Sequence, residues 1–428
     1  MTTDEPGNGP MPPDGDPTTQ APGAHRRFAA LRSRNFATLW GAGLISNAGT
    51  QMQDVALTWL VVQRTNSALA LGLLGLCFAG PMLLLPPLGG LLADRLDRLA
   101  LLKATQALMT LLPLGLAAAL VTGHAPLWLF YAYTLAAAAV YAVAAPTQQA
   151  LVPALAPRDA LLSAIALQSA VWTGARLVGP ALGGLLLPAL GAAWLFALNG
   201  LSTLAVLAAL VGLHAVPGRE PAAPDAVPVR GGGLRYAWAH RPVLAMLALI
   251  AATTLLQGAY MVLLPFFARG SWHAGVRGYG FLLSATGGGA LVGTFGLAAL
   301  GHLGRPVGVV VGGALLYGAA LLVVAHTPVY ALGLTMLALA GVTYAATNTV
   351  LATRLQLVVP GQARGRVMAL QTIAYIPMDA IGALITGGLT HLVGPATALT
   401  CGVLALLLAV PVLARGLASS SAMGEDGR

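Results

Sequence analysis

Residues 89–98 read Gly-Gly-Leu-Leu-Ala-Asp-Arg-Leu-Asp-Arg, and they separate two long apolar runs. In a chain that is only 8% charged, this stretch places two carboxylates and two guanidiniums within five residues. Because such a cluster is costly in hydrocarbon, the sequence predicts a short loop at a membrane surface here. Gly89 and Gly90 lack Cβ atoms, so we expect a neighbouring helix to approach closely at this point.

The rest of the chain supports a membrane setting. It has 428 residues, of which 57% are hydrophobic, and a mean hydropathy of +0.80, whereas about a quarter of the residues of a soluble protein are charged. At about 20 residues per span, the sequence predicts an all-α membrane protein with twelve transmembrane helices. The expected spans are 36–62, 69–92, 99–122, 126–151, 161–187, 190–213, 243–268, 276–301, 306–326, 328–352, 366–389 and 392–414.

The twelve expected helices fall into two six-helix pseudo-repeats. Residues 141–168 align without gaps with residues 344–371, so that Tyr141 meets Tyr344. Parallel repeats of this kind place a substrate site near the middle of the membrane, between the halves. The expected organisation is a disordered tail (1–27), an N-terminal bundle (28–213), a linker (214–242), a C-terminal bundle (243–415) and a second tail (416–428).

The net charge of +9 does not indicate a nucleic-acid partner, because the basic residues are scattered through short loops between apolar runs. On the twelve-helix assignment, all the basic loop residues except Arg64, Arg269 and Arg277 lie on one side. The positive-inside rule therefore predicts that both termini are cytoplasmic. Heavy use of Ala, Gly, Pro and Arg is typical of a GC-rich bacterial genome, so we expect the protein in the bacterial plasma membrane, surrounded by the lipid bilayer. We also expect it to be a monomer.

Asp54, Arg176 and Asp379 fall well inside expected spans. A charge at the bilayer centre costs about 2.5–3.5 kcal/mol even on a lenient scale, so each is a functional candidate. Asp54 and Arg176 belong to the same half, and an ion pair between them is geometrically plausible, either as structural neutralisation or as part of proton or substrate binding. Asp379 has no obvious cationic partner in the sequence, which suits a group that gains and loses a proton in each cycle. The alternative interpretation is a neutral Asp that is hydrogen-bonded within the helix bundle.

Each of these charges sits on a polar stripe with helical spacing, so each stripe should face a water-filled cavity. The cavity candidates on the stripes are Asn47, Gln51, Trp172 and Tyr375.

The stretch at 89–98 resembles the loop between helices 2 and 3 of the major facilitator superfamily, commonly written G-x-L-a-D-R-x-G-R. The matching residues are Gly90, Leu92, Ala93, Asp94, Arg95 and Arg98. Asp97 replaces the usual second glycine, a variant associated with the exporter-like branch. The resemblance implies a rocker-switch fold and proton coupling, with a conformational gate at Gly90, Asp94, Arg95 and Arg98.

Two further features follow from that resemblance. Residues 179–184 resemble part of a motif found in antiporters of the superfamily, through Gly179, Pro180, Gly183 and Gly184, although close packing of small residues is the competing explanation. Helices 7 and 10 line the cavity in the superfamily. The residues that this adds as cavity candidates are Gln257, Tyr260, Tyr344 and Asn348.

The expected function is secondary active transport by alternating access: a proton-coupled antiporter that exports a small amphipathic or drug-like molecule. Uptake of a small solute by symport or facilitated diffusion is the first alternative, and a receptor or scaffold is the second, which the buried charges disfavour. Cys77 and Cys401 both fall in apolar runs, and no metal cluster, catalytic triad or phosphate-binding loop is recognisable. We therefore expect no enzyme activity, no metal and no cofactor.

Overall fold

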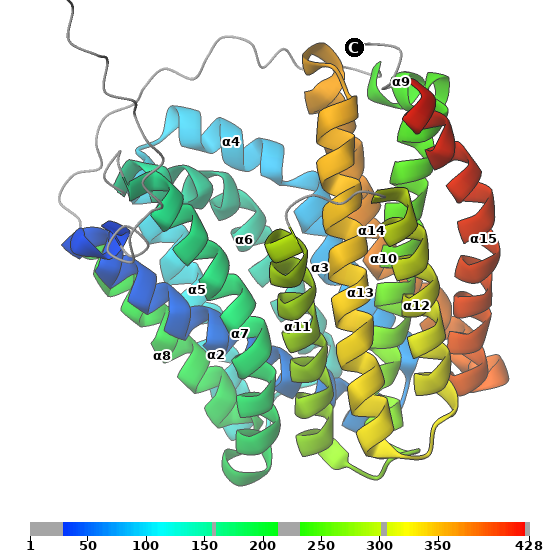
Figure 1. Ribbon diagram of the computed structural model, residues 1–428. Coiled ribbons are helices and arrows are strands. Elements are labelled where there is room, and N and C mark those ends of the chain that lie inside the picture. Colours follow the sequence, from blue (N-terminus) through cyan, green and yellow to red (C-terminus); the bar gives the residue numbers. More distant parts are fainter. Residues whose placement is uncertain (1–28, 156–159, 213–231, 301–305, 424–428) are drawn as a thin grey trace, which may run out of the picture.

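The computed structural model describes residues 29–155, 160–212, 232–300 and 306–423 (Figure 1). The expected tail 1–27 and most of the expected linker 214–242 lie outside these ranges. The helices in them are η1 (Ala29–Arg32), α2 (Arg34–Thr65), α3 (Ala68–Leu84), α4 (Pro86–Arg95), α5 (Arg98–Val121), α6 (Leu127–Leu155), α7 (Leu161–Leu190), α8 (Ala192–Val211), α9 (Gly232–Ala239), α10 (Arg241–Arg269), α11 (Gly275–Leu300), α12 (Pro306–His326), α13 (Tyr330–Val358), α14 (Gly361–Val393) and α15 (Pro395–Met423).

The described helices make twelve crossings. Ten helices are long and apolar enough to span a membrane, and α3 with α4 forms an eleventh span that is bent by 44°. The twelfth is α2, whose 32 residues would reach about 48 Å but whose polar stripe lowers its hydropathy. The prediction of an all-α, twelve-helix membrane fold in two six-helix repeats is confirmed.

The two ends of the bundle differ. We call the end at which α2 begins and α8 ends the linker end, and the opposite end, where α2 turns into α3, the hairpin end. Arg34, Arg98 and Arg241 begin helices at the linker end, whereas Arg64 and Arg269 end helices at the hairpin end. Arg277 also lies at the hairpin end, but many more arginines lie at the linker end. Those that helix ends place there include Arg32, Arg95, Arg354, Arg364 and Arg366.

The repeat is visible in the backbone. Gly191 joins α7 to α8 and Gly394 joins α14 to α15, and both adopt left-handed φ angles, 80° and 79°. The two glycines are 203 residues apart, as are Tyr141 and Tyr344. Since a side chain is strained at such a φ, glycine is favoured at the same turn of both halves.

The halves meet along two crossings, α3 with α14 and α7 with α11, both closer to the hairpin end. Glycines bring the backbones together there: a Cβ on Gly72 would lie 2.8 Å from the Cα of Leu384, and one on Gly184 would lie 3.0 Å from the Cα of Gly280. Gly387 lies equally close to the start of α3, at Ala68. These contacts describe a conformation that is closed at the hairpin end.

Within the C-terminal half, α10 and α14 cross with even less space. A Cβ on Gly258 would collide with the carbonyl oxygen of Asp379, and one on Gly382 would collide with that of Leu255. Two glycines, one from each helix, therefore let the backbones touch. Interfaces between membrane helices are commonly built from small residues in this way.

We expect Gly258→Ala to lower the free energy of unfolding by about 1–3 kcal/mol, because the added methyl group must push α14 away. Thermal or chemical denaturation of the purified protein in detergent measures this. Gly312→Ala is the matched control, since Gly312 is also helical but has no atom within 4 Å of its missing Cβ. Equal stability of the two variants would contradict the close crossing.

Candidate functional site

A central cavity of about 450 Å³ lies between the two halves. The N-terminal half contributes α2 and α7 to its wall, and the C-terminal half contributes α10, α11 and α13. Seven of the residues selected from the sequence line it: Gln51, Asp54, Trp172, Arg176, Pro180, Gln257 and Tyr344. The polar stripes of α2 and α7 therefore face a common space, as their helical spacing predicts.

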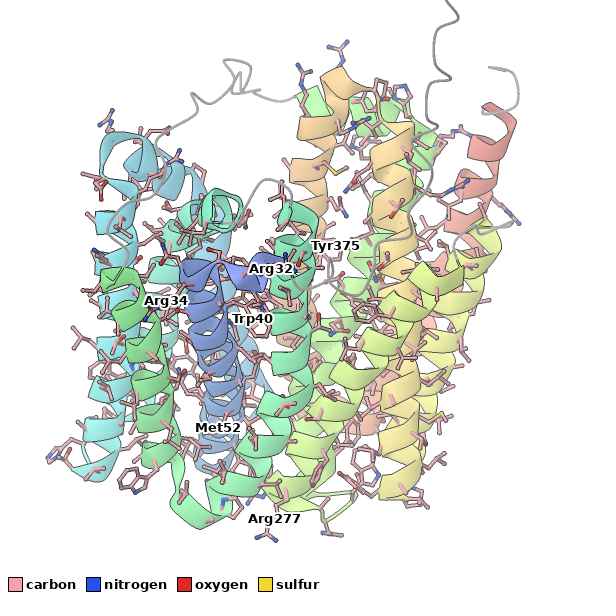
Figure 2. All side chains as sticks on the ribbon, turned by 60° about the vertical axis from the view of Figure 1, so that its left-hand side comes forward. Arg32, Arg34, Trp40, Met52, Arg277 and Tyr375 are labelled. Carbon is pink, nitrogen blue, oxygen red and sulfur yellow. The ribbon has the colours of Figure 1, made fainter. Side chains whose placement is uncertain are left out.

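Asp54 lies deep in the bundle. Figure 2 shows α2 running from Arg34 past Trp40 to Met52, toward the end that carries Arg277. Asp54 follows Met52 by two residues and is exposed only where it borders cavities, since it lines both the central cavity and a second one. Among the described residues its carboxylate has no recorded hydrogen bond or ion pair.

In the described structure, no ion pair within 4 Å joins Arg176 to Asp54. The ion pair that the sequence made plausible is therefore not formed in this conformation. Arg176 instead interacts electrostatically with Asp379 of the opposite half. Its backbone packs on Gly287 of α11, where a Cβ would lie 2.6 Å from the carbonyl oxygen of Arg176. Glycine at this position lets α11 of the opposite half approach α7 closely beside Arg176.

Arg176 and Asp379 are also equivalent positions. They are 203 residues apart, the offset that relates Tyr141 to Tyr344, and they occupy α7 and α14, the corresponding helices of the two repeats. The two positions lie eight residues beyond the aligned segments 141–168 and 344–371, at the same offset. Asp379 is exposed on α14 but lines neither of the two large cavities.

A hydrogen-bonded group of side chains orients Gln257. The hydroxyl of Tyr260 donates to Gln257 Oε1 at 3.3 Å, and that of Tyr317 donates to the same oxygen at 3.5 Å. With Oε1 occupied, the amide nitrogen of Gln257 is free to donate to a ligand in the central cavity. Tyr317, fully buried on α12, was missed; its signal is that it is a single polar aromatic residue in an apolar run.

Asn348 and Tyr375 lie behind the cavity wall. Tyr375 donates to Asn348 Oδ1 at 3.2 Å, and Asn348 Nδ2 donates to the carbonyl of Tyr344 at 3.0 Å and to Thr253 Oγ1 at 3.4 Å. These contacts tie α14, α13 and α10 together. Tyr260, Asn348 and Tyr375 are therefore placed to support the lining, and none of them borders the two large cavities.

The second cavity, about 460 Å³, lies inside the N-terminal half. Asn47 lines only this cavity, whereas Gln51, Asp54 and Trp172 border both. Its wall contains buried amides that the sequence reading did not select, Gln53, Gln106 and Asn199. Each is a polar residue in an apolar run, and such residues in membrane helices usually face the bundle interior.

The antiporter-like motif packs α7 between two neighbours. Gly179 lies against Ala48 and Gln51 of α2, Gly183 lies against Met52, and Gly184 lies against α11. Pro180 also borders the central cavity. The small residues permit close approach on both faces of α7, and α7 thereby holds the helix of Asp54 next to the opposite half.

The expected loop at 89–98 is largely helical, which corrects the sequence reading. Pro86 and Pro87 occupy the first positions of α4, where a proline is tolerated, so a new helix starts after the bend and continues through Arg95. Asp94, Arg95 and Arg98 are all exposed, at the linker end. The cluster therefore marks the end of a bent span.

Two other details at this end differ from expectation. Gly89 contacts the backbone of Val143 on α6, but Gly90 has nothing within 4 Å of its missing Cβ, so only Gly89 permits a close approach. Asp97, the residue that departs from the superfamily motif, caps α5 by accepting from the backbone N–H of Ala100 at 2.7 Å. An Asp just before an apolar periodic run is a helix-start signal that could have been read.

In the described part of the chain, no group of three or more His, Cys, Asp or Glu side chains could hold a metal ion. Cys77 on α3 and Cys401 on α15 are free thiols. The described site is thus made of two carboxylates, one guanidinium, amides and aromatic rings, which can bind and release organic molecules and protons.

Twelve helices in two repeats around such a cavity define a membrane transporter of the major facilitator class. The model of the transmembrane secretion effector family matches residues 25–421, and the chain belongs to that family. It is 28% identical over 386 residues to the enterobactin exporter EntS of Shigella boydii serotype 18 and to that of Escherichia coli O139:H28, covering 90% of each chain.

Solved structures show the same fold. A bacterial homologue of the human lysosomal transporter Spinster, in an inward-facing and unoccupied conformation, has a TM-score of 0.65 at 17% identity, covering 91% of this chain and 95% of its own. The nucleoside transporter NupG has a TM-score of 0.64 at 11% identity, covering 90% of this chain and 99% of its own. These likenesses show the fold, while the family match and the exporter relatives identify the chain as a transporter rather than an enzyme.

Proposed function

We propose that this protein is a proton-coupled antiporter that exports a small amphipathic molecule across the bacterial plasma membrane. The observation that carries the proposal is the central cavity, whose described lining has two charged side chains, Asp54 and Arg176, beside aromatic and apolar groups. Relatives named as enterobactin exporters support the outward direction. Beside Asp54, the spans contain a second carboxyl group, Asp379, which interacts with the cavity residue Arg176 and can take up and release the coupling proton.

The proposal includes an alternating-access cycle. In the described conformation the halves are packed together at the hairpin end through Gly72, Gly184 and Gly387. We propose that the linker end is cytoplasmic, because the arginines concentrate there. This conformation would then receive substrate from the cytoplasm, and rocking of the halves would open the opposite end.

The test is transport by purified protein in liposomes with an imposed pH gradient, screened against a panel of amphipathic compounds. Antiport requires that substrate and protons move in opposite directions and that substrate accumulation disappears when an ionophore collapses the gradient. Protein-free liposomes control for passive leakage. Movement of substrate and protons in the same direction would establish symport and reject the proposal.

The orientation gives a separate prediction. In a variant with Cys77 and Cys401 replaced by alanine, we expect Ser271→Cys to react with an impermeant thiol reagent added outside intact cells, and Pro224→Cys to remain unlabelled until the cells are opened. Ser271 is exposed in the hairpin-end turn between α10 and α11. Labelling of both positions from outside would contradict the proposed topology.

A further inference from the structure

The cavity inside the N-terminal half is lined by one acidic residue and by no basic residue among those described. It is enclosed by α2, α5, α6, α7 and α8, with Phe78 of α3. Asp54 is the one charged side chain in its described lining, which includes no Lys, Arg or His. The described lining therefore offers one carboxyl group and no basic side chain to pair with it.

Four of the polar side chains of the wall are joined in a hydrogen-bonded network, and a fifth, Gln106, bonds to a backbone carbonyl. Gln53 Nε2 donates to Tyr133 Oη at 2.6 Å, and Asn199 Nδ2 donates to Gln53 Oε1 at 2.8 Å. Thr50 Oγ1 donates to Asn199 Oδ1 at 3.3 Å, and Gln106 Nε2 donates to the carbonyl of Thr203 at 3.1 Å. This network fixes the ring of Tyr133 near Asp54, with which it interacts electrostatically.

Four aromatic rings stand among the aliphatic side chains of the wall. Tyr141 and Trp172 meet edge to face with their centroids 6.4 Å apart, and Tyr133 and Phe78 add two more rings. Faces of aromatic rings attract cations, most strongly where water is excluded. Rings and a single carboxylate thus favour the same kind of ligand, one with a delocalised or shielded positive charge on an apolar body.

Other ligand classes fit less well. A divalent metal ion prefers six or more oxygen ligands, usually with several carboxylates, and this wall has one. An anion would be repelled by Asp54, and the Arg176 guanidinium borders the central cavity instead. The cavity of about 460 Å³ falls in the range of sites for small organic molecules.

We propose that the cavity inside the N-terminal half is a binding site for a monovalent organic cation with an aromatic body, whose charge is held by Asp54. The inference deepens the proposed function by naming a substrate class for the exporter, and it rests on that function only for the step from binding to export. Since Asp54 also borders the central cavity, a cation released there would remain near the same carboxylate.

The test is equilibrium dialysis of 1-methyl-4-phenylpyridinium against the purified full-length protein. Its uncharged relative 4-phenylpyridine, in mildly alkaline buffer, serves as competitor. We expect the cation to bind at least about tenfold more tightly than the neutral compound, and Asp54→Asn to remove about the same factor. Asp97→Asn, which removes an acidic residue far from the cavity, should leave binding unchanged. Equal affinity for both compounds would overturn the proposal.

A matched pair of variants locates the site. Ala137 lines only the N-terminal cavity and Ala345 only the central one, and both are partly buried small residues. We expect Ala137→Phe to weaken cation binding about tenfold or more and Ala345→Phe to leave it within about twofold. The opposite pattern would place the cation in the central cavity and overturn the proposal. Because dialysis needs no transport, active antiport by a protein that binds no cation would reject this inference alone.

Discussion

We expect Asp379→Asn to abolish accumulation of substrate against its gradient while leaving substrate binding and downhill exchange largely intact. Asp379 is a carboxylate inside a span, borders neither large cavity, and interacts electrostatically with Arg176 across the interface between the halves. A proton bound there changes that interaction whenever the halves move. Transport is measured in the same liposomes with and without a pH gradient. The first measurement reports proton-driven accumulation, and the second reports downhill exchange of substrate.

Asp379→Glu is the control, because it keeps the carboxylate on α14 and should retain a large part of the driven transport. The asparagine variant keeps the backbone contact of residue 379 with Gly258, so the α10–α14 crossing is preserved. Accumulation by Asp379→Asn at the wild-type level would show that another group couples the proton.

We expect Asp94→Asn to reduce transport at least about tenfold without a comparable loss of folded protein. We propose that Asp94, Arg95 and Arg98 join the linker ends of the two halves when the cavity opens at the hairpin end. Losing the negative charge weakens that contact, because charge-assisted hydrogen bonds are about twice as strong as neutral ones. Initial transport rates, divided by the amount of protein in the membrane, measure the effect.

Asp97→Asn is the matched comparison for Asp94→Asn. Asp97 is three residues away and equally exposed, but its carboxylate caps α5 by accepting from Ala100. Asn caps a helix about as well as Asp, so transport should remain near wild type. If both variants transport normally, the proposed latch is wrong; if both fail alike, the charge of the whole bend, rather than Asp94, is what matters.

Much of the fold could be predicted because hydrocarbon permits few alternatives. Backbone N–H and C=O groups inside hydrocarbon must be hydrogen-bonded within a helix, so long apolar runs predict membrane-spanning helices. The span that corresponds to α2 was predicted in this way despite its polar stripe. The offset between Tyr141 and Tyr344 predicted the repeat that Gly191 and Gly394 now show in their backbone angles. Cavity residues such as Gln51 and Trp172 followed from helical spacing alone.

What the sequence could not supply is which helix faces meet. The expected Asp54–Arg176 pair required knowing where the Arg176 side chain points, and in the structure it interacts with Asp379 of the opposite half. Most of the loop expected at 89–98 is helical because Pro86 and Pro87 start a new helix, α4, which continues to Arg95. The charges at 94–98 favoured a loop, and the helix-starting effect of the prolines was not considered. Gln53 and Asn199 escaped notice because their importance depends on a mutual hydrogen bond between α2 and α8.

The equivalence of Arg176 and Asp379 has a consequence for the response to membrane voltage. Repeats related by an axis along the membrane normal hold equivalent residues at the same depth. One elementary charge carried across the membrane is worth about 2.3 kcal/mol per 100 mV, but two opposite charges that stay at matching depths carry no net charge when the halves rock. While Asp379 is unprotonated, Asp54 is therefore the one unbalanced charge described inside the spans. A proton on Asp379, or a cation at Asp54, should change how strongly voltage biases the carrier.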